Sequence, residues 1–142
     1  MKLLDDLADD HLIIAEMLQQ VVERGIITDE ARTSLRSIKA LMLFHLKKEN
    51  DTFYPVLRRA ARTDKELEKL LETNGRELEA IYAMAMRFFE KYSVGGNDKD
   101  FARDLGMLYA ALRERILREE RTLFKEYEKQ VTESRPGRVG GP

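Results

Sequence analysis

The sequence predicts an all-α protein folded as an up-down-up-down antiparallel four-helix bundle. Charged residues make up 36% of the 142 residues, and the chain holds only 8 Gly and 3 Pro. This composition favours long solvated helices over a turn-rich β-sandwich or barrel. Apolar residues recur at alternating steps of three and four along four segments, as on one face of a helix. Short connections join the segments, so consecutive helices are expected to be antiparallel neighbours.

The first two helices have recognisable ends in the sequence. Gly25 is expected to end the first helix. The second is expected to begin at Thr28 or Asp29, because either side chain can cap a helix. Pro55 lacks a backbone N–H and interrupts the regular hydrogen bonding of the second helix. Residues 54–61 are therefore expected to continue it as a kinked final turn.

The third and fourth helices are bounded by similar signals. Thr63, followed three residues later by Glu66, forms a capping-box pattern at the start of the third helix. The glycine pair at 95–96 is expected to end this helix, and residues 97–98 to start the fourth. The fourth helix is expected to fade after Tyr127.

The domain boundary follows from the composition of the C-terminal end. Residues 1–131 are expected to form the bundle. Residues 132–142 include the run RPGRVGGP, which is poor in apolar residues. We expect this segment to be a flexible tail or a linker remnant.

Composition also excludes several classes of function. The chain has no cysteine, which rules out disulfides, a zinc-thiolate site and a catalytic thiol. Its 25 Lys+Arg and 26 Asp+Glu are interspersed. The sequence therefore has no basic patch of the kind that binds nucleic acid, and nucleic acid is not an expected partner. The longest apolar run has only seven residues, at 80–86. No signal peptide or membrane span is therefore expected, and a cytoplasmic location is the default.

Polar residues interrupt the apolar stripes at particular places. In an antiparallel bundle, the start of the first helix is level with the end of the second, the start of the third and the end of the fourth. The six polar residues on the stripes all fall in that half, so one layer could bring them together. They are His11, His45, Glu49, Asn74, Arg115 and Glu119.

The pair His45 and Glu49 is the best candidate for metal binding. A separation of four residues is one helical turn, so both side chains lean toward the same site. A bundle core can hold iron or manganese through histidine and carboxylate ligands from facing helices. The spacing alone is weak evidence, and the shared layer strengthens it.

Three motifs together resemble the hemerythrin-like, or HHE cation-binding, domain family. The first helix carries Asp10-His11, and the second carries HLKKENDTFYP at 45–55. The fourth carries RILREERTLF at 115–124, which repeats the frame of the second with arginine in place of histidine. The resemblance covers residues 3 to about 128.

The resemblance implies a non-haem di-iron centre with histidines from all four helices and two bridging carboxylates. It also implies oxygen binding, oxygen or nitric oxide sensing, peroxide chemistry or iron handling. By position, the matching metal ligands are His11, His45, Glu49 and Glu119. Asn74 and Arg115 stand where the other two histidines are expected, so the ligand set is degenerate.

Arg115 is the largest departure from the family pattern, because a guanidinium stays protonated and cannot bind a cation. Our hypothesis is that Arg115 replaces one metal by pairing with Glu49 and Glu119. At most a single cation would then bind near His11 and His45. The alternative is that Arg115 turns to solvent along the bundle surface.

Asn74 also has two interpretations. It can belong to the polar layer, or Asn74-Gly75, with Glu77 following, can be a turn or cap that breaks the third helix. Glu77 is a less favoured neighbour of the site than the four proposed ligands.

The sequence therefore predicts a degenerate iron site in a sensor or regulatory module for oxygen, nitric oxide or iron, with a diatomic ligand as a further partner. The alternative is a metal-free bundle that serves as a protein-interaction module. An enzyme is less expected, because the sequence offers no independent base, nucleophile or phosphate loop. Apolar residues off the main stripes suggest a homodimer or a partner protein. They are Ile13, Leu43, Phe44 and Tyr82.

Overall fold

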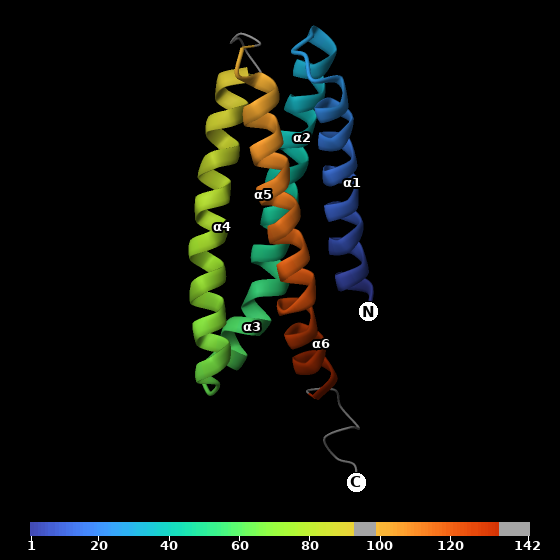
Figure 1. Cartoon of the computed structure of the whole chain (residues 1–142). Helices are drawn as coiled ribbons and strands as arrows, with labels where there is room; N and C mark the ends of the chain where they lie inside the picture. Colours follow the sequence, from blue (N-terminus) through green and yellow to red (C-terminus); the bar gives the residue numbers. More distant parts are fainter. Residues whose placement is uncertain (93–98, 134–142) are drawn as a thin grey trace.

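A computed structural model describes residues 1–92 and 99–133, and it confirms the all-α bundle. Four long helices lie side by side (Figure 1). They are α1 (Lys2–Arg24), α2 (Asp29–Lys48), α4 (Lys65–Tyr92) and α5 (Phe101–Arg121). A π-helical turn, η1 (Glu49–Phe53), and α3 (Tyr54–Ala61) continue α2, and α6 (Leu123–Glu133) continues α5. Helix α1 packs on α2 and α5, and α4 packs on the same two helices.

The ends of the first two helices follow the predicted signals. Gly25 closes α1 in the left-handed conformation, with φ of 65°, and its N–H donates to the Val21 carbonyl at 3.1 Å. At the start of α2, the Thr28 hydroxyl accepts from the Ala31 N–H at 3.0 Å. Thr28 rather than Asp29 is therefore the cap.

The second helix changes its hydrogen bonding before it reaches Pro55. The Tyr54 N–H donates to the Glu49 carbonyl, five residues back, as in a π-helix. Pro55 explains the wider turn, because it has no N–H to donate to residue 51 and its ring would clash there. The predicted continuation over residues 54–61 is confirmed as α3.

The cap of α4 differs by one residue from the prediction. Asp64, and not Thr63, accepts from the N–H groups of Glu66 and Leu67, both at 3.1 Å. A carboxylate at this position also interacts favourably with the helix dipole. The Thr63 hydroxyl instead bonds the Ala60 carbonyl at 3.5 Å.

Replacing the cap should destabilise the protein measurably. We expect Asp64→Ala to lower the free energy of unfolding by about 1 kcal/mol, because two N–H groups of α4 lose their acceptor. Thr63→Ala is the matched control and should change it by less than about 0.5 kcal/mol. Urea denaturation of the two variants and the wild type checks this. Equal losses in both variants would contradict the assignment.

One of the two interpretations of Asn74 and one expected helix end were wrong. Helix α4 continues through Asn74 and Gly75, so this pair is neither a turn nor a cap. The last helix does not fade after Tyr127 but continues as α6, because Val131 still packs on the core. Residues 132–133 of the predicted tail 132–142 belong to α6. The predicted boundary at residues 95–98 and the rest of the tail, 134–142, lie outside the described residues. No described helix has the length and apolar character needed to cross a membrane.

The core consists of two apolar clusters stacked along the bundle. One joins α1, α2, α4 and α5 and contains Leu18, Ile38 and Phe101. The other lies around α3 and α6 and contains Leu7, Phe53 and Leu123. Along each helix, five of the six polar residues of the stripes fall between these clusters, and Asn74 lies between Leu71 and Leu78 of the second cluster. Apolar packing on both sides thus removes this level of the bundle from water.

Candidate metal centre

The polar layer predicted from the sequence is present and buried. In the described part of the chain, the buried polar side chains are the six predicted ones, with exposed fractions from 2% to 8%. Burying charged groups is costly unless each finds a partner or a metal. Their partners therefore decide what the layer can do.

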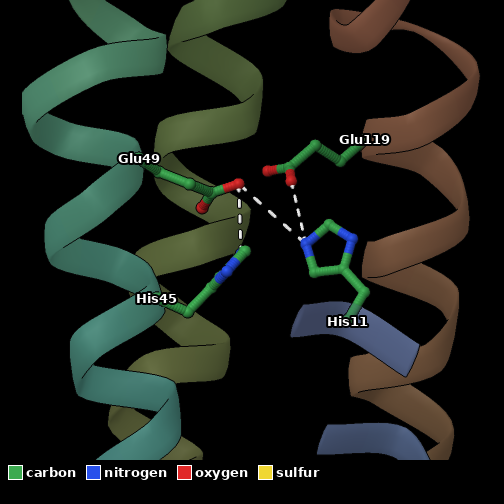
Figure 2. A group of neighbouring side chains, drawn as sticks. All are labelled: His11, His45, Glu49 and Glu119. Atoms are coloured by element: carbon green, nitrogen blue, oxygen red, sulfur yellow. Dashed lines mark ion pairs between the residues drawn. The ribbon is translucent and has the colours of Figure 1, made fainter. Parts of the chain in front are cut away.

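Four of these side chains converge from three helical segments (Figure 2). His45 Nε2 lies 3.4 Å from Glu49 Oε2, and His11 Nε2 lies 3.3 Å from Glu119 Oε1. Glu49 Oε2 is also 4.0 Å from His11 Nε2. One ligand atom from each of the four residues lies within 4.8 Å of the others. A single ion could therefore contact all four after small side-chain rotations.

Two carboxylates outside this cluster orient its histidines. His11 Nδ1 lies 2.7 Å from Glu120 Oε2, and His45 Nδ1 lies 2.9 Å from Asp10 Oδ2. An ionised carboxylate can only accept, so each Nδ1 carries the proton. In the neutral form of each ring, the Nε2 lone pair then faces the cluster. This is the arrangement by which carboxylates hold metal-binding histidines in the right tautomer.

No role for Asp10 or Glu120 was predicted from the sequence, although each is adjacent to a cluster residue. Each carboxylate serves the histidine of a different helix rather than its neighbour in sequence. Asp10 also accepts from Lys48 Nζ at 2.8 Å. Burial opposes ionisation of Asp10, but the hydrogen bonds from His45 and Lys48 hold its pKa below the ordinary value. Asp10 thus stays ionised and continues to accept the hydrogen bond from His45 Nδ1.

Several atoms of the cluster fit a cation because they are buried and lack a hydrogen-bond partner. His45 Nε2, Glu49 Oε2 and Glu119 Oε1 are buried and have no hydrogen-bond partner within the described residues. All three are electron-pair donors that point at the same place. Nitrogen and carboxylate oxygen together suit iron, manganese or zinc. The residues present therefore fit a metal ion.

The two buried carboxylates of the cluster, Glu49 and Glu119, lie close together and shift each other's pKa. Burial and the adjacent Glu119 raise the pKa of Glu49. Burial would also raise the pKa of Glu119, but hydrogen bonding to His11 outweighs it and lowers the pKa. Burial lowers the pKa of His11, yet the carboxylate of Glu119 reverses the direction and raises it. Positive charge is thus favoured at this site, whether it comes from protons or from a cation.

Tyr54 is a member of the layer that sequence reasoning missed. Its hydroxyl donates to Glu119 Oε2 at 2.9 Å and accepts from Asn74 Nδ2 at 3.1 Å. Burial raises the pKa of the Tyr54 phenol, so it stays protonated. The sequence feature that could have indicated this role is the position of Tyr54 in the second-helix motif, directly before Pro55. Tyr54 directs the other oxygen of Glu119 toward the histidines, and Asn74 stands behind it rather than in the cluster.

Arg115 contradicts both predictions made for it. It forms no ion pair with Glu49 or Glu119, and it does not turn to solvent, since only 6% of it is exposed. Its Nη1 donates instead to Glu77 Oε2 at 3.4 Å. The Glu77 side chain is 33% exposed, so pairing with it requires less desolvation than pairing with a fully buried carboxylate. Glu77 is therefore near the site but contacts Arg115 rather than the four proposed ligands.

Removing the carboxylate behind His45 tests its orienting role. We expect Asp10→Asn to weaken cation binding by about 10- to 100-fold, because the His45 ring loses its fixed tautomer. Competition with a chromophoric chelator would measure the affinity. Asp9→Asn is the matched control, as this neighbouring carboxylate is exposed. Similar affinities for the two variants would contradict the role given to Asp10.

Comparison with known proteins agrees with this geometry. The model of a family described as the hemerythrin HHE cation binding domain matches residues 2–127. Neither the search of curated proteins nor the search of solved structures returned a match.

Proposed function

Because the chain belongs to the hemerythrin HHE cation-binding family, we propose that it binds one non-haem iron ion and acts as a sensor or regulatory module. The proposed ligands are His11 Nε2, His45 Nε2 and the carboxylates of Glu49 and Glu119. The observation that carries the proposal is the convergence of four ligand atoms, of which three have no hydrogen-bond partner in the described structure. We assign the function to the domain of residues 1–131.

A single ion is proposed because two positions of the layer lack the histidines that a di-iron centre would use. A di-iron centre of the kind that the resemblance implies draws histidines from all four helices. Here the third-helix position is Asn74, whose amide donates to Tyr54, and the fourth-helix position is Arg115, which donates to Glu77. No histidine or carboxylate of α4 belongs to the described cluster. The remaining donor set is sufficient for one ion.

The arrangement supports regulation better than turnover. The ligands come from α1, from the end of α2 with η1, and from α5. Binding would therefore tie together three segments of the bundle, and loss of the ion would release them. A ligand shifts a conformational equilibrium to the extent that it binds one state better. When bound, iron would supply one-electron chemistry and a position for oxygen or nitric oxide.

Metal titration tests this function directly. Purified metal-free protein, loaded anaerobically with ferrous iron and desalted, should retain one iron per chain by elemental analysis. Two tightly held irons per chain would contradict the single site. No retained iron, manganese or zinc would contradict cation binding altogether.

A metal-free interaction module is the second candidate, and exposed apolar side chains favour it. Phe44 is 64% exposed, Ile13 47% and Leu43 40%. Such side chains on a surface are typical of contacts with a second copy or a partner protein. Tyr82, expected among them, is instead half-buried. Absence of bound metal, together with unchanged stability of His45→Leu, would favour this function over the first.

A further inference from the structure

Arg115 has unsatisfied hydrogen-bond donors inside the bundle. Its Nε and Nη2 are buried and have no partner in the described part of the chain. The one carboxylate that it contacts, Glu77, also accepts from Arg118 Nη1. A buried guanidinium with two unused donors is unfavourable. Such a group points to a ligand that accepts from both.

A small cavity lies beside this guanidinium. Its volume is about 70 Å³, and Arg115 lines it together with the four proposed cation ligands. The rest of its wall is mainly apolar and includes Ile14, Met42 and Leu112. One water molecule occupies about 30 Å³ of the liquid, so the cavity of about 70 Å³ has room for about two water molecules or one small anion of similar size.

The chemistry of the free donors defines the class of ligand. Nε–H and one Nη2–H lie on the same edge of the planar guanidinium and point in nearly the same direction. This edge matches two oxygens of one planar anion, in the bidentate pairing typical of arginine. We propose that Arg115 binds a small monovalent oxyanion, such as formate or nitrite, in this cavity.

The proposed anion site rests on the proposed function, because it needs the cation. Without a cation, the carboxylates of Glu49 and Glu119 line the same cavity and repel an anion. A divalent ion would neutralise these two carboxylates and so remove their repulsion, while the Nε and Nη2 donors of Arg115 stay free to bind the anion. Anion and cation should therefore bind with positive coupling, each raising the affinity for the other.

Calorimetric titration of zinc-loaded protein tests the proposal. Zinc(II) is used because it is redox-inactive, and its binding is measured first. Sodium formate and sodium nitrite should then each bind at one site per chain, at least about tenfold more tightly than to metal-free protein. Benzoate should not bind, because the cavity is too small for its ring. Formate should in turn raise the affinity for zinc.

Variants of Arg115 separate the proposed site from direct binding to the metal. Arg115→Met should keep zinc but lose about tenfold or more in formate affinity, and Arg115→Gln provides a second variant if the first does not fold. Arg118→Met is the matched control, since it removes the other arginine on Glu77 and should keep wild-type affinity. Equal formate affinity in Arg115→Met and the wild type would overturn the proposal.

The two proposals fail in distinguishable ways. Absence of zinc binding by the wild type would contradict the proposed function, and the coupled anion site with it. Zinc binding without formate or nitrite binding would contradict the anion site alone.

Discussion

Ferrous iron added anaerobically to the metal-free protein is expected to raise its free energy of unfolding by about 4 kcal/mol when the free ion is at about 1,000 times its Kd. The folded chain holds the four ligand atoms within 4.8 Å of one another. The unfolded chain separates residues 11, 45 and 119 by more than thirty positions each, so it binds the ion far more weakly. Urea denaturation with and without iron measures the shift.

His45→Leu should lose this shift, because it removes one nitrogen ligand. Asp104→Asn is the matched control and should keep it. Asp104 belongs to the start of α5, where it pairs with Lys91 at 3.4 Å and contributes nothing to the cluster. A full shift in His45→Leu would show that iron stabilises the protein from some other site.

Glu49→Gln is expected to stabilise the metal-free protein by about 1–3 kcal/mol at pH 8 while abolishing its response to iron. Glu49 is 2% exposed, and its Oε2 has no hydrogen-bond partner in the described structure. The amide has the same shape and carries no charge, so burying it beside Glu119 requires less desolvation. On this argument, the Glu49 carboxylate lowers the free energy of unfolding of the metal-free wild type but is needed as a metal ligand.

The pH dependence of this effect has a definite sign. Burial and the proximity of Glu119 raise the pKa of Glu49 above its ordinary value of 4.5. A group with a raised pKa contributes its stability below the unfolded pKa and loses it as the pH rises. The advantage of Glu49→Gln should thus grow as the pH rises above about 4.5. Denaturation at pH 5 and pH 8 in the presence of chelator measures it.

Glu90→Gln, at an exposed position of α4, is the control for loss of a carboxylate and should behave as the wild type at both pH values. A Glu49→Gln variant that is less stable than the wild type at pH 8 would contradict the prediction. It would mean that the charged carboxylate is already satisfied in the metal-free protein.

The position of the polar layer could be predicted because it depends on local and simple quantities. Each residue advances an α-helix by about 1.5 Å, and short connections make consecutive helices antiparallel. These two facts relate the heights of His11, His45 and Glu119 without any knowledge of packing. All six predicted residues are buried in the structure.

Errors arose where neighbouring residues offer nearly equivalent chemistry. Asp64 rather than Thr63 caps α4, since both side chains could reach the free N–H groups. The break near Pro55 begins at Glu49, because a proline affects the hydrogen bonds of the turn before it. Such differences of one turn or less are decided by packing and not by pattern.

The sequence by itself determined the bundle, the family resemblance and the level at which polar residues are buried, because helical periodicity is a property of the chain alone. The tertiary structure decided which side chains meet. In the folded chain, side-chain hydrogen bonds join Arg115 with Glu77, His45 with Asp10, His11 with Glu120, and Glu119 with Tyr54. These pairings depend on how each helix is rotated about its axis, and the packing of all helices together sets that rotation.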